Sequence, residues 1–487
     1  MKTTNSRRRA FLGSLLAAGC SLAASSRAQT HDACGQAVTT RDVTHCLASA
    51  PHARALPVLA ADKVYTLPEL IDIAEMASPE GRIAWAHAKR AMEEAGVARA
   101  LYLPVLSFEA QGSDLRAIVP FPKPIAPRGY VTVEEPTAAI QLQLEYSVVD
   151  FSRGARVDAG KALAIGSALQ LSRTNQRIAY TTAVQFYRTQ LDAGRLEAAK
   201  TILQTAETLL ENAQSQYDNG RATLPDVQNA QAGAAQARFE LSSAEGAVQK
   251  SKLALTETIG IEPTTEIQVA SQAQGAPVDE TEMHVEELVH SAWKTRPDLL
   301  ARAQDLRHAR DAARKAQAAY LPSLTLGATG GQTALWPTAD YGLLGHASVS
   351  TWSVEAKLRW ELFNGARKHE VGAAMAEEKT AGEEQRAAQD AVTREVWQAY
   401  VDYRTAIEQE RSADSFLKAS ETSYDSSLDA YKYGVRSLVD VVQAERQLAQ
   451  ARLAAVQSKA QYLQSAITLT YATGSLLSND TLPGVTP

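Results

Sequence analysis

The chain repeats itself once, and this duplication constrains its fold more than any other feature of the sequence. Short motifs recur in the same order at offsets of 218 and then 214 residues: Ser78-Pro79 with Arg296-Pro297, Tyr102-Leu103-Pro104 with Tyr320-Leu321-Pro322, Val148-Val149-Asp150 with Leu362-Phe363-Asn364, and Tyr217-Asp218-Asn219-Gly220 with Tyr431-Lys432-Tyr433-Gly434. Motifs that recur in the same order over most of the chain indicate two copies of one structural unit. The offset changes once, so the first copy has four additional residues in a loop between Pro104 and Asp150.

The duplication sets the predicted domain organisation. A signal peptide over residues 1–28 precedes an N-terminal extension over 29–63. The first repeat covers 64–262, a linker covers 263–281, and the second repeat covers 282–476. Residues 477–487 form a C-terminal tail.

Each repeat predicts a helix followed by a β-hairpin. The helices run for about 35 residues, from Leu67 to Leu101 and from Val285 to Ala319, and end before Pro104 and Pro322. The predicted strands cover residues 105–110, 140–146, 323–328 and 354–360. Alternation in the second strand is strict: Ile140, Leu142, Leu144 and Tyr146 face one way, and Gln141, Gln143 and Glu145 face the other.

The remainder of each repeat has the pattern of long coiled-coil helices. Apolar residues follow a 3,4 spacing on both sides of Gly220: Leu196, Ala199, Leu203, Ala206, Leu210, Ala213, Tyr217, and then Val227, Ala230, Ala234, Ala237, Leu241, Ala244, Val248. The helix that leads to the Gly220 turn covers roughly 60 residues, or about 90 Å at 1.5 Å per residue. The fold class is therefore α+β, with long coiled-coil helices and two β-hairpins in each chain.

The N-terminus carries an export signal. Three arginines at 7–9 precede an apolar stretch, and Ser26-Arg27-Ala28 is a cleavage site of the small-x-small type. The arginines also fit a twin-arginine signal, and Ala17-Ala18-Gly19-Cys20 fits a lipoprotein signal that would leave Cys20 lipidated. In either case Cys34 and Cys46 reach an oxidising compartment, where a local disulfide between them is expected.

Composition and motifs argue against two classes of function. The net charge of −6 provides no basic field for a nucleic-acid partner. The sequence has no HExxH, GxSxG or GxxxxGK[ST] motif, so no catalytic residue and no cofactor are expected. No metal site is expected either, because His284 and His290 lie six residues apart, whereas helical metal pairs prefer a spacing of three or four.

The alternating hairpins call for an assembly. Two hairpins supply four strands, which are too few to close a bacterial outer-membrane barrel. Three chains would supply twelve strands, with one face toward lipid and the other toward a water-filled lumen. A non-conducting periplasmic coiled-coil scaffold or adaptor remains the alternative, although such a protein has no use for the alternating strands.

These features resemble the TolC-like outer-membrane efflux proteins over about residues 64–476. The resemblance is carried by the paired Tyr-Leu-Pro motifs, Leu362-Phe363-Asn364-Gly365, and the helix-turn-helix tips with Asp226-Val227 and Asp440-Val441. It implies a homotrimer in the outer-membrane lipid of a Gram-negative bacterium, with a 12-strand barrel and a periplasmic helical tunnel. It further implies the passive exit duct of a tripartite efflux or type I secretion system, docked to a periplasmic adaptor and an inner-membrane pump.

The resemblance also implies roles for the helical tips. Gly220 and Gly434 would form the tip turns, and Leu224 and Leu438 would contact the adaptor beside them. Asp440 would contribute to a ring of carboxylates at the channel entrance. Tyr431 and Arg436 would hold the entrance closed against a neighbouring tip, with Asp226 as the acceptor.

The chain departs from the family pattern at two tip positions. Gln443 stands where the family has a second tip acid, and Pro225 replaces a side chain with bonding capacity. The alternative is that the tip residues are solvated helix starts, where aspartate is favourable by itself.

Overall fold

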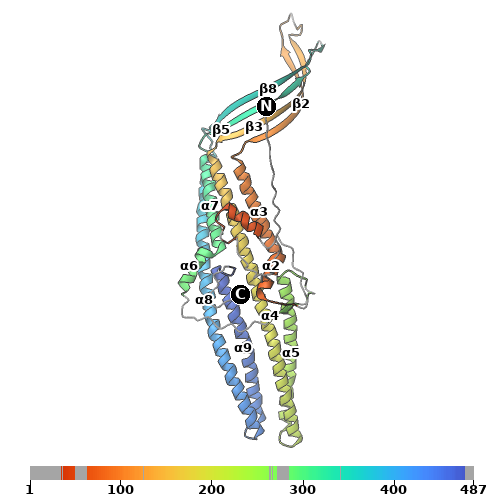
Figure 1. Cartoon of the computed structure of the whole chain (residues 1–487), viewed down its shortest axis with the longest axis vertical. Coiled ribbons are helices and arrows are strands. Elements are labelled where there is room, and N and C mark those ends of the chain that lie inside the picture. The colour runs from red at the N-terminus through yellow and green to blue at the C-terminus, as the bar shows by residue number, and fades with distance from the viewer. Residues whose placement is uncertain are drawn as a thin grey trace, which may run out of the picture.

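The computed structural model describes residues 34–35, 37–49, 63–123, 126–262, 265, 267–270, 284–340 and 342–477. The signal peptide and Cys20 lie outside the described residues. The molecule is elongated, with a sheet of four long and two short strands at one end and paired long helices that reach the other end (Figure 1). None of the described helices combines the length and the hydropathy needed to span a bilayer.

Both repeats have the same order of elements. The first comprises α2 (Leu67–Ala77), α3 (Pro79–Ala100), β2 (Val105–Pro120), β3 (Tyr130–Val149), α4 (Phe151–Asp218) and α5 (Leu224–Thr258). The second comprises α6 (Val285–Thr295), α7 (Pro297–Ala318), β5 (Ser323–Leu335), β8 (Ala347–Arg359), α8 (Arg367–Lys432) and α9 (Leu438–Thr473). Short strands β1 (Val64–Tyr65) and β4 (Gln268–Val269) pair in parallel, and β6 (Thr338–Ala339) and β7 (Gly342–Leu343) lie in the second hairpin loop.

The first helix of each repeat is broken, so the prediction of one continuous helix was wrong. Ser78 and Arg296 are extended, with ψ of 123° and 118°, because the proline that follows each of them disfavours helical geometry at the preceding residue. The Ser78 hydroxyl then caps α3 by accepting a hydrogen bond from the Gly81 amide at 3.3 Å. Each repeat therefore has a joint between a short and a longer helix.

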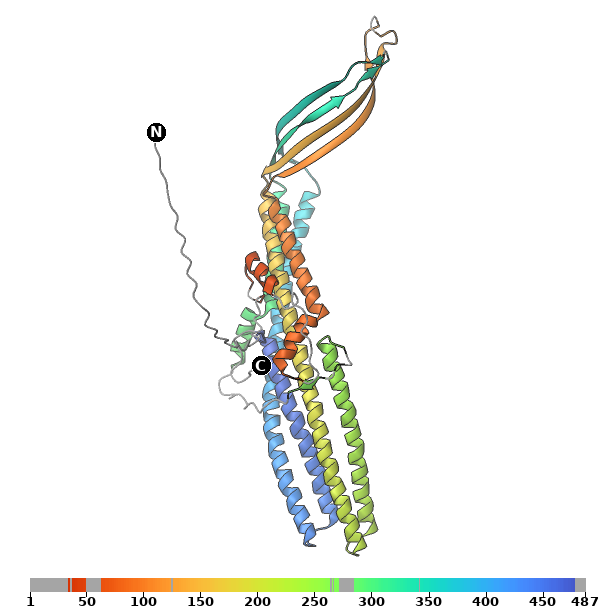
Figure 2. The same cartoon turned by 45° about the vertical axis from the view of Figure 1, so that its right-hand side comes forward.

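The two long helices, α4 and α8, have different packing partners near the sheet and near the other end of the molecule. α4 has 68 residues and α8 has 66, so each extends about 100 Å at 1.5 Å per residue. Near the sheet, α4 packs between α3 and α7, and α8 packs on α7. Toward the other end, α4 pairs with α5, α8 pairs with α9, and α9 joins the two pairs by packing on α4 (Figure 2).

The largest apolar clusters lie at the level of the two joints. One combines α2 with α4, α5 and the end of α9, around Leu70, Phe186, Leu255 and Ile259. The other combines α6 with α7, α8 and α9 around Val396, Tyr403 and Leu469. Below this level the paired helices pack mainly through alanines, among them Ala206, Ala234 and Ala237, which allow their backbones to approach closely.

The four long strands of the sheet have the order β2–β3–β5–β8, and the short strands β6 and β7 extend it where β6 pairs with β3; every neighbouring pair is antiparallel. Its strands run well beyond the predicted segments: β2 has 16 residues and β3 has 20. Alternation weakens toward the hairpin loops, where Gly112, Pro136 and polar residues interrupt it, so the sequence pattern marked only the half of each strand nearest the helices. The four strands curve together as one sheet (Figure 2).

The N-terminal extension contributes α1 (Thr40–Ser49), and a disulfide joins Cys34 to Cys46 with a Cα–Cα distance of 5.1 Å. This confirms the expected cysteine pairing.

Candidate functional site

One face of the sheet is apolar across all four strands. The register places Leu142 beside Phe108, Leu144 beside Leu106, and Leu326 beside Tyr146. The same face carries these further residues: Ala110, Ile140, Leu324, Ala328, Trp352, Val354, Ala356 and Leu358. Phe108 is 67% exposed and Trp352 is 80% exposed in the single chain. Because a contiguous exposed apolar surface marks a membrane or protein contact, this face requires a cover.

The opposite face of the same strand segments is polar. The predicted set Gln141, Gln143 and Glu145 lies there, which confirms the alternation read from the sequence. The neighbouring strands add Ser107, Glu109, Thr325, Thr329, Ser353, Glu355, Lys357 and Arg359. The Gln141 side chain donates to Glu109 Oε2 at 2.9 Å. The sheet therefore has one apolar face and one polar face.

Both outer strands of the sheet are long and open along one edge. In the part of the chain that the structure describes, β2 pairs only with β3, and β8 pairs only with β5. β2 has 16 residues and β8 has 13, so each presents a long row of backbone donors and acceptors without a strand beside it. Such edges favour pairing with further copies.

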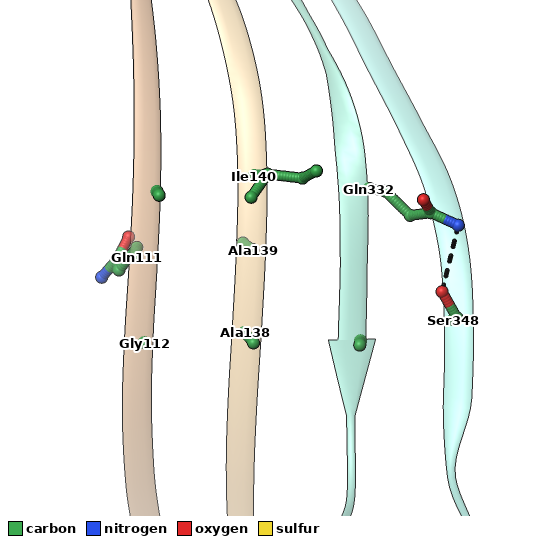
Figure 3. A pocket seen from close by; sticks show the side chains of 9 residues that line it. Gln111, Gly112, Ala138, Ala139, Ile140, Gln332 and Ser348 are labelled. Carbon is green, nitrogen blue, oxygen red and sulfur yellow. Dashed lines mark hydrogen bonds between the residues drawn. The ribbon is translucent and has the colours of Figure 1, made fainter.

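A shallow hollow lies on the apolar side, nearer the loops. Figure 3 shows Gly112 and Ala138 on adjacent strands beside it, with Ile140 and Gln332 at one end. Its polar contact is a hydrogen bond from Gln332 Nε2 to Ser348 Oγ at 3.1 Å. The hollow exists because most of the side chains that line it are small, and none of the lining residues is charged.

A matched pair of buried arginines joins the sheet to the long helices. Arg153, at the start of α4, lies over the Tyr102 ring at 4.7 Å and donates to the Val148 carbonyl at 3.2 Å. Arg367, at the start of α8, lies over the Tyr320 ring at 5.0 Å and donates to Glu361. Sequence analysis missed both arginines, although they recur at the repeat offset of 214.

Replacing Arg153 with methionine is expected to lower stability by about 1–2 kcal/mol, because the cation–π contact and a charge-assisted hydrogen bond are both lost. Thermal unfolding of the purified protein measures this effect. Arg156→Met is the control, since Arg156 is an exposed residue of the same helix turn. Equal losses in the two variants would contradict the assigned role of Arg153.

The far ends of the helices are two hairpin tips. Gly220 and Gly434 lie at the turns with φ of 71° and 75°, a left-handed conformation that favours glycine. The structure therefore confirms the predicted turns. The Gly220 turn joins α4 to α5, and the Gly434 turn joins α8 to α9 (Figure 1).

The two tip aspartates take equivalent positions as capping-box residues. Asp226 Oδ2 accepts hydrogen bonds from the Thr223 amide at 2.8 Å and hydroxyl at 2.6 Å. Asp440 Oδ2 accepts the same pair from Ser437, at 3.1 and 2.8 Å. Hydrogen bonds from the Ser437 side chain and amide lower the pKa of the exposed Asp440 below its ordinary value. Among the described residues, Oδ1 of each aspartate makes no hydrogen bond, so one charged oxygen of each remains available.

Neither predicted latch residue bonds to Asp226 within the described part of the chain. Arg436 Nη1 donates to Ser427 Oγ at 3.0 Å, which ties it to its own hairpin. The Tyr431 hydroxyl is buried and has no hydrogen-bond partner among the described residues. Burial, followed by the negative charge of Asp226, raises the pKa of Tyr431, so the phenol stays protonated near that carboxylate.

The two tip leucines have different environments. Leu224 is 51% exposed, as a docking residue would be. Leu438 is 4% exposed and packs against Leu209, Ala213 and Val441, so in this conformation it supports the tip from inside. The exposed apolar residues of the second tip are its neighbours Tyr433, Val435 and Val439, which the sequence analysis did not select.

Comparison with known proteins identifies the family of this chain. The family model described as outer membrane efflux protein matches residues 70–261 and 288–475. The chain belongs to this family. Protein CyaE of Bordetella pertussis is 28% identical over 441 residues, which are 86% of each chain.

Solved structures share the fold of this outer membrane efflux protein. The outer membrane protein VceC of Vibrio cholerae aligns with a TM-score of 0.68 at 20% identity, covering 84% of this chain and 96% of VceC. The MtrE outer membrane channel of Neisseria gonorrhoeae, solved in its open state, aligns with a TM-score of 0.68 at 18% identity, covering 85% and 90%.

Proposed function

We propose that this protein is the passive exit duct of a tripartite export system in the outer membrane. Three chains close a barrel of twelve strands, with the apolar sheet face toward lipid and the polar face around a water-filled lumen. The α-helices continue as a tunnel into the periplasm. There the tips meet a periplasmic adaptor and an inner-membrane pump.

The observation that carries this proposal is the two-faced sheet with two open edges. A face that holds Phe108, Leu142 and Trp352 in contact with water is unfavourable in a monomer, and lipid removes that cost. Pairing β2 of one copy with β8 of the next satisfies both edges at once. Closure of the barrel also places Glu109, Glu145, Glu355 and Lys357 around an aqueous interior rather than in lipid.

The tips supply the proposed entrance. Three copies of the exposed Asp440 bring three carboxylates to the narrow end, where a ring of this kind favours cations. In each copy the hydrogen bonds from Ser437 lower the pKa of Asp440 and so favour its charged form. Tyr431 and Arg436 remain candidates for contacts between neighbouring tips. Leu224, Val435 and Val439 offer the apolar surface for an adaptor.

A non-conducting periplasmic scaffold is the second candidate, since long helical hairpins serve that role equally well. The exposed apolar face of the sheet speaks against it, because a scaffold in water would have no cover for that face.

Conductance in a planar lipid bilayer tests both the duct and the entrance ring. The purified wild-type protein is expected to show a small, steady conductance that divalent cations block. Asp440→Ala is expected to raise the concentration needed for block by at least tenfold, because the ring loses its charge.

Asp429→Ala provides the matched control, since Asp429 is an exposed acid near the same tip that pairs with Lys432 at 3.1 Å. Its block is expected to match that of the wild type. If Asp440→Ala conducts and is blocked by divalent cations as the wild type is, the duct proposal stands and the proposal of a carboxylate ring is wrong. A folded trimer that never inserts would favour the scaffold.

A further inference from the structure

The disulfide-closed segment around α1 lies outside the two ranges that match the family, yet it is packed into the helical wall. Val43, Cys46 and Leu47 occupy one face of α1 at helical spacing, and all three are buried. Cys34 and Ala37, which precede the helix, are also buried. The segment is the red helix that crosses the middle of the molecule in Figure 1.

The α1 helix packs on α3 and α4, and the apolar cluster around it extends to α7 of the second repeat. Ala88 of α3 and Ala168 of α4 come from the first repeat, and Ala301 of α7 comes from the second. All three alanines are essentially inaccessible to solvent and belong to one apolar cluster with Val43 and the two cysteines. Because alanine projects so little from a helix, these three helices leave a shallow bed that the disulfide segment fills.

Specific hydrogen bonds fix α1 at both ends. Trp85 Nε1 of α3 donates to the Leu47 carbonyl at 3.0 Å, near the C-terminal end of α1. Arg99, near the top of α3, donates to the Thr40 hydroxyl at the other end. At the start of α1, the Thr39 hydroxyl accepts from the Asp42 amide at 3.2 Å, and Asp42 Oδ2 accepts in return from the Thr39 amide at 2.7 Å, so the pair caps the helix.

We propose that the segment is an oxidation-dependent clasp that docks on the helical wall only after Cys34 and Cys46 are joined, and thereby holds α3 against α4. A ten-residue helix is marginal by itself in water. Closing the loop between residues 34 and 46 removes much of the conformational freedom that docking would otherwise have to restrict. The clasp therefore stays open in a reduced chain and closes in an oxidising compartment.

The redox step is an ordinary thiol–disulfide exchange. The thiols of Cys34 and Cys46 give up two protons and two electrons as the S–S bond forms. A protein disulfide of the thiol-oxidase class accepts them and becomes a dithiol. The expected export signal brings the chain to a compartment that contains such an oxidant.

Limited trypsin digestion of the full-length protein in detergent tests the clasp, with cleavage after the exposed Arg41 measured by mass spectrometry once the digest is quenched and reduced. Cleavage of the Cys34→Ser/Cys46→Ser variant, or of wild type treated with dithiothreitol, is expected to be about 100-fold faster than cleavage of oxidised wild type. The melting temperature of the same double variant is expected to fall by a few degrees, because α1 no longer holds α3 against α4.

Two further variants separate docking from disulfide formation. Val43→Asp keeps the disulfide but disrupts the buried face, so rapid cleavage is expected even when the protein is oxidised. His45→Asp alters an exposed position of the same helix and should cleave as slowly as wild type.

Three results would overturn the proposal. Equal protection of the double-serine variant and the wild type would show that packing alone holds α1. Rapid cleavage of oxidised wild type would show that α1 is not docked. Faster cleavage with an unchanged melting temperature would show that the segment does not lock the wall. None of these readouts uses conductance, so they are independent of the bilayer experiment.

Discussion

Leu142→Arg is expected to abolish stable insertion into the outer membrane. Leu142 lies on the apolar face beside Phe108 and across β5 from Trp352. An arginine on the lipid face of a barrel costs about 2–4 kcal/mol near the bilayer midplane. Three copies in a trimer bring the cost to about 6–12 kcal/mol, which is comparable to the whole stability of many proteins. The measurement is the amount of heat-modifiable trimer in the outer-membrane fraction.

Gln141→Arg is the matched control, because the adjacent residue points to the opposite face. Its side chain already donates to Glu109, so an arginine there retains an acidic partner in an aqueous setting. Near-normal insertion is expected. If the two variants insert equally well, the apolar face does not meet lipid. If both fail, the sheet tolerates arginine on neither face and the assignment of sides loses its support.

The faces of the sheet were predictable because a period of two in a strand maps directly onto two sides. The alternation from Ile140 to Tyr146 identified both faces, and the duplication extended the reading to the second hairpin. The outer halves of the strands were not predictable, because Gly112 and Pro136 interrupt the alternation of apolar and polar residues there. Their pairing depends on neighbouring strands, which a local pattern does not report.

The tips show where sequence reasoning reached the position of a residue but not its contacts. Glycine at 220 and 434 fixed the turns, since a left-handed residue ends a helix. Burial of Leu438 and the bond from Arg436 to Ser427 depend on how two hairpins pack, and no local spacing encodes that. The same limit explains why Arg296 was noticed only as part of a repeated X-Pro pair.

Arg296→Met is expected to destabilise the protein by about 3 kcal/mol, because it removes the buried cation that Asp298, Glu395 and a helix-end carbonyl share. The Arg296 side chain is 3% exposed. It donates to Asp298 at 2.6 Å, to Glu395 at 2.6 Å and to the Ala472 carbonyl near the end of α9 at 3.1 Å. One guanidinium thus links α7, α8 and α9. Glu395 is half exposed, which places the expected loss at the lower end of the range for buried pairs.

Arg302→Met is the control, six residues further along the chain in α7. Arg302 is about half exposed and pairs with Asp305 at 3.4 Å and Glu384 at 3.3 Å, so its loss should cost less than about 1 kcal/mol. Denaturant unfolding of both variants gives the comparison. Similar losses at the two positions would show that Arg296 behaves as a surface residue.

The pH dependence of the loss in unfolding free energy provides a readout that lost packing alone would not change. Burial works against ionisation of Asp298, but hydrogen bonds from Arg296 and the charge of Arg173 outweigh it and lower the pKa of the carboxyl. Asp298 therefore contributes its full stabilisation above the ordinary aspartate pKa, and that contribution is lost as the pH falls through the lowered folded-state pKa. In Arg296→Met burial acts with less opposition, so the pKa of Asp298 rises. The loss of unfolding free energy relative to the wild type should therefore be largest near neutral pH and shrink as Asp298 is protonated in acid. A loss of the same size at neutral and acid pH would assign it to packing of the arginine stem instead of to its charge.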